Sequence, residues 1–177
     1  MAGQKWTAKL KATQIGLLSL YREQRNSLTT PEAIIPPSDI LSVITMDVVR
    51  REIVENKLEN DHVKLKEKLL ELEEVAIPTL VETWALVKHM PQAKSYQFDI
   101  NYDLGRIRSL AYLILSAVND QRADAMFEQA KLDFVQAAEN AAPLQLKAAL
   151  QSIGSEPTLA ALGSQRMDEI RGIFDLK

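Results

Sequence analysis

The chain has 177 residues, of which 46% are hydrophobic and 25% charged, a composition typical of a globular protein with a buried core. Its 21 basic and 24 acidic side chains leave a formal charge of −3, which is too small to indicate a polyanionic partner by itself. The chain contains no cysteine, which excludes disulfides, thiolate metal sites and cysteine nucleophiles and fits a cytosolic protein.

No secretory signal and no membrane span are expected. The N-terminal residues MAGQKWTAKLK are basic but contain neither an uninterrupted apolar segment nor a small-residue cleavage site. The most apolar stretch, residues 110–118, is about nine residues long, whereas a membrane-spanning helix needs about twenty. We therefore expect a soluble protein of the cytoplasm or of an assembled particle.

The first predicted element is an amphipathic helix from Thr7 to about Ser27. Its apolar face is formed by Trp6, Leu10, Thr13, Leu17, Leu18 and Tyr21. Residues 1–30 contain one acidic side chain and five basic ones, namely Lys5, Lys9, Lys11, Arg22 and Arg25. Such a basic helix is suited either to the phosphates of a nucleic acid or to an acidic protein surface.

A proline-bearing strap follows this helix. Pro31, Pro36 and Pro37 fix their own backbone angles and push the preceding residues toward extended geometry. Ile34 and Ile35 lie between these prolines, in a segment with no helix or sheet of its own to bury them. They either pack on the core of their own chain or lie across another subunit. We interpret residues 1–37 as an arm and residues 38–177 as a helical bundle domain.

Residues 39–90 form a run without glycine and with one proline, Pro78. The β-branched residues at positions 40–54 would also suit a strand. Their apolar positions form two adjoining helical stripes instead of alternating, so a helix with a wide buried face is the preferred interpretation. Ser38 is the predicted N-cap of this helix.

The second half of this run carries a narrow apolar stripe with a 4-3-4-3-4 spacing, which is typical of a helix paired with another helix. The stripe consists of Leu58, His62, Leu65, Leu69, Leu72 and Ala76. Because the remaining surface is charged, we expect a projecting, coiled-coil-like arm of two helices. Pro78 should kink this arm, since the stripe resumes in step beyond it.

Three further segments complete the predicted bundle. A core helix begins at Asn101 or Asp103 and is apolar nearly all round, with a main stripe of Leu104, Ile107, Ala111, Ile114 and Val118. After a turn at Asn119-Asp120, an alanine-rich helix runs to about Asn140. A short helix from Pro143 to Ser152 should end at Gly154 in a left-handed cap, and Ser155 should open a last helix to Phe174. The sequence thus predicts an all-α protein of five to seven helices.

The sequence offers weak signals for chemistry. Glu59 and His62 have the Glu-x-x-His spacing of di-iron helical bundles, but the second copy that such a site needs is missing. The acidic group of Glu71, Glu73 and Glu74 is typical of a solvated helix face. No nucleotide-binding, hydrolase or zinc-protease motif occurs. We therefore expect no metal, no cofactor and no enzymatic activity, and a helical enzyme whose site is assembled from scattered residues is a third alternative.

The favoured function is a structural subunit that self-associates or bridges neighbours in a larger assembly, for which a viral head–tail connector is one setting. The predicted partner-binding residues are Trp6, Ile34, Ile35, Leu58, Leu65, Leu69 and Leu72. The alternative is a helical accessory subunit of a nucleic-acid complex, which would use the five basic residues of the N-terminal helix.

Overall fold

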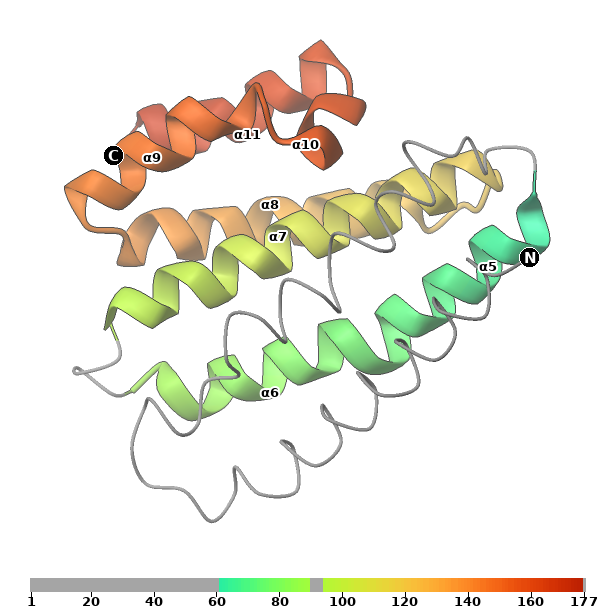
Figure 1. Ribbon diagram of the computed structural model, residues 1–177, viewed down its shortest axis with the longest axis horizontal. Coiled ribbons are helices and arrows are strands. Elements are labelled where there is room, and N and C mark those ends of the chain that lie inside the picture. Colours follow the sequence, from blue (N-terminus) through green and yellow to red (C-terminus); the bar gives the residue numbers. More distant parts are fainter. Residues whose placement is uncertain (1–60, 90–93, 177) are drawn as a thin grey trace, which may run out of the picture.

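A computed structural model of the chain describes residues 61–89 and 94–176 (Figure 1). This part of the chain is built from helices and contains no strand, which confirms the predicted all-α class. The predicted arm of residues 1–37, the boundary at residue 38 and the helix over 40–54 lie outside the described residues.

The helices form three layers (Figure 1). The first layer is one continuous helical segment made of α5 (His62–Glu71), η4 (Leu72–Ala76) and α6 (Ile77–Val87). The middle layer pairs α7 (Lys94–Ala117) with α8 (Ala123–Asn140). The third layer contains α9 (Pro143–Ile153), α10 (Pro157–Ala161) and α11 (Ser164–Asp175).

Helix α7 lies at the centre because it has apolar residues on two sides. One side packs on the first layer and contributes Leu104, Ile107, Ala111 and Ile114 to a buried cluster. The other side contributes Phe98 to a second cluster, which lies between the middle and third layers. The prediction that this helix forms the centre of the core is confirmed.

The described part of the first layer packs on the bundle, so the predicted projecting arm is not confirmed. Leu65, Leu69 and Leu72 are at most 5% exposed and pack in one cluster with α7. The described leucines of the narrow stripe and Ala76 are therefore buried against a helix of the same chain, whereas His62 of the stripe is exposed. A two-helix arm and a core helix with one narrow contact share the same apolar spacing, so the sequence could not separate them.

The segment passes through Pro78 without ending. Pro78 has no N–H to donate to the carbonyl of Glu74, and its ring needs room on that side of the helix. The wider π-helical turns of η4 lie immediately before it, and the Ile77 N–H donates to the Leu72 carbonyl, five residues earlier. Because these turns are wider than α-helical ones, the chain accommodates the proline within a continuous helix.

Helix α7 begins at Lys94, earlier than predicted. Phe98 and Ile100 are buried, so tertiary packing extends the helix toward its N-terminus. Asn101 lies inside the helix, where its side-chain amide donates to the Gln97 carbonyl at 2.8 Å. It is therefore no cap.

The C-terminal predictions need three corrections. Gly154 has a φ of −75° and Gly163 a φ of 86°, so the left-handed glycine is Gly163, which separates α10 from α11. The expected single last helix is thus two helices. The N-cap of α10 is Glu156 and not Ser155, because a Glu156 carboxylate oxygen accepts from the Leu159 N–H. The predicted turn at Asn119-Asp120 is confirmed, with Asn119 at a φ of 54°.

Candidate functional site

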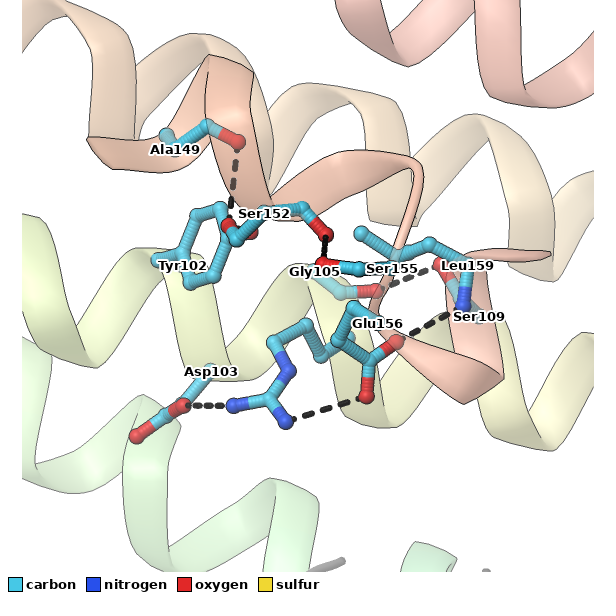
Figure 2. A network of polar contacts seen from close by, with 10 residues as sticks. Tyr102, Asp103, Gly105, Ser109, Ala149, Ser152, Ser155, Glu156 and Leu159 are labelled. Atoms are coloured by element: carbon cyan, nitrogen blue, oxygen red, sulfur yellow. Dashed lines mark hydrogen bonds and ion pairs between the residues drawn. The ribbon is translucent and has the colours of Figure 1, made fainter. Parts of the chain in front are cut away.

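A polar network built on Arg106 joins the middle and third layers (Figure 2). Arg106 Nη1 lies 3.2 Å from Asp103 Oδ1, and its Nη2 lies 3.1 Å from Glu156 Oε1. The second oxygen of Glu156 accepts from the Leu159 N–H at 2.7 Å. One carboxylate thus binds the arginine of α7 and caps α10, which fixes these two helices to each other.

Burial sets the electrostatics of this network. It raises the pKa of Asp103 to about 6, although the positive charge of Arg106 acts in the opposite direction. Burial also opposes the charge on Arg106, but Glu156 and Asp103 outweigh it and raise the pKa of the guanidinium. The arginine therefore keeps its charge, whereas Asp103 takes up a proton in mildly acidic solution.

Tyr102 extends the network into the second apolar cluster. Ser152 Oγ donates to the Ala149 carbonyl at 3.0 Å, so the Tyr102 hydroxyl donates to Ser152 Oγ at 3.2 Å. The Tyr102 ring stacks on Phe98 at 5.4 Å between centroids and meets the edge of Phe134 at 5.6 Å. Burial raises the pKa of this phenol. The Tyr102 ring thus packs among aromatic side chains, and its hydroxyl has a hydrogen-bond partner.

A second ion pair lies between α7 and α8. Arg108 Nε is 3.0 Å from Asp133 Oδ2, and both side chains are less than one-fifth exposed. Burial raises the pKa of Asp133 to about 6, against the opposing effect of Arg108. The arginine also reaches Gln129 at 3.4 Å. These polar contacts of Arg108 fix the relative position of α7 and α8 beside their apolar contacts.

A third arginine joins α11 to the middle layer. The Arg166 guanidinium carbon lies 4.6 Å from the Tyr112 ring centroid and 4.4 Å from that of Phe127. Its Nη2 also pairs with Asp124 at 2.9 Å. Cation–π contacts of this kind hold a charged side chain over an apolar cluster.

These three arginines each bind a carboxylate of a neighbouring helix or its cap, and none of them was predicted as a site residue from the sequence. A signal was present for two of them, because Arg106 and Arg108 interrupt a helix that is apolar nearly all round. A charge in such a helix needs a partner. The partners are about 25 to 50 residues away, so periodicity within a helix could not identify them. Each of these carboxylates is bound to an arginine of another helix. We therefore interpret the three ion pairs as contacts that hold the helices together.

The structure describes only some of the residues that the sequence singled out for function. Leu65, Leu69 and Leu72 lie together in the first cluster, where their side chains are covered by the chain itself. The other predicted partner-binding and nucleic-acid-binding residues lie outside the described ranges, namely Trp6, Ile34, Ile35, Leu58, Lys5, Lys9, Lys11, Arg22 and Arg25.

The described acidic and histidine residues of the first layer do not converge. His62 is exposed at the start of α5, and Glu59 lies outside the described residues. Glu71 pairs with Lys68 at 3.6 Å and Glu73 with Arg122 at 3.1 Å, whereas Glu74 is exposed. Within residues 61–89 and 94–176, no three histidine or acidic side chains are grouped so that they could hold a metal ion.

Three apolar side chains are exposed along one side of the first layer. Val63 is 69% exposed, Leu70 is 52% exposed and Val81 is 41% exposed, and all three lie opposite the buried stripe of the same continuous segment. We call this side the outer surface. Leu132, Leu144 and Leu176 are also exposed, but each is on a different helix or at a helix end. Single exposed leucines are common, whereas an apolar series along one helix indicates a contact surface.

No family model, curated protein or solved structure matches this chain. None of the described helices is long and apolar enough to cross a membrane.

Proposed function

We propose that this protein is a non-enzymatic structural subunit that assembles with other protein subunits through the outer surface of its first layer. The observation that carries the proposal is the exposure of Val63, Leu70 and Val81 on one side of a continuous helical segment. Each such side chain that becomes fully buried against a partner would contribute about 1.5–3 kcal/mol to the free energy of association.

The arrangement behind this surface supports the same function. The opposite side of the segment is held by Leu65, Leu69 and Leu72, which are buried against α7. The outer surface therefore belongs to a supported element of the bundle and not to an isolated helix. A rigid helical face of this kind is a common recognition element between proteins. A particle component such as a head–tail connector is one setting for such a subunit, by analogy of fold class alone.

The mass of the full chain in solution tests this function. Light scattering coupled to size-exclusion chromatography should give a defined oligomer whose fraction rises with concentration. Changing Val63, Leu70 and Val81 together to serine should convert it to a monomer with unchanged helical content. A matched control, Leu132→Ser with Leu144→Ser, removes exposed leucines from other helices and should leave the oligomer intact.

Two results would contradict the proposal. The first is a wild-type chain that stays monomeric at every concentration, because the outer surface is expected to self-associate. An oligomer that survives the triple serine change would place its interface elsewhere.

A further inference from the structure

The outer surface has a symmetric distribution of charge about Leu70. Lys66 precedes Leu70 by four residues and Glu74 follows it by four, and both side chains are exposed. Lys66 lies about 6 Å before Leu70 along the α-helix axis, and Glu74 lies in the π-helical turns of η4 that follow. A basic group and an acidic group thus lie at similar distances on the two sides of a half-exposed leucine.

This pattern is self-complementary when two copies pack antiparallel. A two-fold axis through Leu70 places Lys66 of each copy opposite Glu74 of the other. This gives two identical ion pairs, each between a basic and an acidic side chain. The same axis places Leu70, which is 52% exposed, against Leu70 of the second copy. Contacts repeated in this way define an isologous interface.

We propose that the occupant of the outer surface is a second copy of this chain, packed antiparallel along α5 and η4 with Leu70 on the two-fold axis. This inference rests on the proposed assembly function and names its partner. The two Leu70 side chains cover each other in the middle of the contact, and the Lys66–Glu74 pairs fix its direction. A parallel arrangement would bring Lys66 against Lys66 and Glu74 against Glu74, which is repulsive.

The neighbouring charges are compatible with this arrangement. Glu67 falls opposite Glu73 of the second copy, but the Glu73 carboxylate is already paired with Arg122 at 3.1 Å. Lys66 contributes to the lowered pKa of Asp120, whose carboxylate is bound mainly by Arg122. Both oxygens of Asp120 are bound by Arg122, with Nε at 3.2 Å from Oδ1 and Nη2 at 3.0 Å from Oδ2.

Charge reversal gives the decisive test with the full chain. Lys66→Glu alone and Glu74→Lys alone each replace both ion pairs by repulsion, so each variant should self-associate at least about tenfold more weakly. In an equal mixture of the two variants, the two reversed groups attract each other and the two unchanged groups still pair. Mixing should therefore restore association. Lys147→Glu, an exposed charge reversal on α9, is the matched control and should associate like the wild type.

A cross-linking experiment tests the two-fold axis directly. The natural chain has no cysteine, so Leu70→Cys introduces a single thiol. A thiol on the axis lies next to its own copy, and mild oxidation should give a disulfide-linked dimer at low protein concentration. Leu132→Cys places the thiol at a leucine of α8 that is 57% exposed and should remain monomeric under the same conditions.

The outcomes separate this inference from the function on which it rests. A wild-type oligomer that is unaffected by either charge reversal would overturn the antiparallel contact while leaving an assembly function standing. So would a mixture that fails to associate after both single variants have lost association. A wild-type chain that is monomeric at all concentrations would overturn both proposals.

Discussion

Gly105 and Phe134 face each other where α7 packs on α8. A Cβ atom built on Gly105 would lie 2.7 Å from two ring carbons of Phe134, Cε1 and Cζ. The Phe134 ring is fully buried and also contacts Tyr102 and Phe174, so it has little room to move. The absence of a side chain at position 105 therefore sets the distance between the two central helices.

We expect Gly105→Ala to destabilise the fold, although alanine is the better helix former. The added methyl group would force the Phe134 ring or the α8 backbone to shift, at a cost of about 1–3 kcal/mol. Gly172→Ala is the control, because Gly172 is also helical and its added Cβ would meet nothing within 4 Å. That change should raise the free energy of unfolding by about 0.4–1 kcal/mol. Urea unfolding of both variants measures the difference, and equal effects would contradict the close approach.

We expect the Arg106–Glu156 pair to contribute more to stability than an exposed pair of similar length. Glu156→Ala should cost about 2–4 kcal/mol, because it removes the cap of α10 and leaves Arg106 with one partner fewer. Glu156→Gln should cost less, since an amide oxygen can still accept from the Leu159 N–H. Asp168→Ala is the control, because Asp168 pairs with Arg171 at 2.7 Å on the exposed surface. It should change stability by less than about 1 kcal/mol. A cost for Glu156→Ala no larger than this would contradict a structural role for the network.

We expect stability to rise as the pH falls from about 6 to about 4. Asp103 and Asp133 each have a pKa near 6 in the folded chain, above the ordinary value of 3.8. Between these values the folded state binds more protons than the unfolded state, so the free energy of unfolding increases with acidity and is reduced at neutral pH. Unfolding measured at several pH values should show this slope in the wild type.

The asparagine variants provide the comparison for this pH dependence. Asp103→Asn and Asp133→Asn each remove one titrating carboxyl, so each should reduce the slope between pH 4 and pH 6, and the double variant should reduce it further. A double variant with the same slope as the wild type would show that other groups carry the pH dependence.

Leu65 and Leu70 lie five residues apart on α5 and should behave in opposite ways. Leu65 is fully buried, so Leu65→Ala should destabilise the chain by about 2–5 kcal/mol. Leu70 is 52% exposed, so Leu70→Ala should leave the thermal transition nearly unchanged and weaken self-association. Unfolding and mass measurements on both variants check the pair. An unchanged stability for Leu65→Ala would contradict the packing of α5 on α7.

Periodicity in the sequence was enough to predict the fold class and the central helix. The repeated apolar positions of Leu104, Ile107, Ala111 and Ile114 define a helical face whatever that face contacts. The same holds for Leu65, Leu69 and Leu72, whose burial follows from their spacing. Periodicity describes one helix at a time, so it gave the apolar face of the first layer but not the helix that covers it.

Only the tertiary structure decided what depends on residues far apart in the chain. It showed that the narrow stripe packs on α7 in the same chain, that Glu156 binds Arg106, and that Gly105 allows Phe134 to approach. It also revealed the outer surface, because an exposed leucine such as Leu70 can be recognised only after the buried side of its helix is known. The physical reason is that backbone periodicity is a local property, whereas burial and ion pairing depend on which distant segments meet.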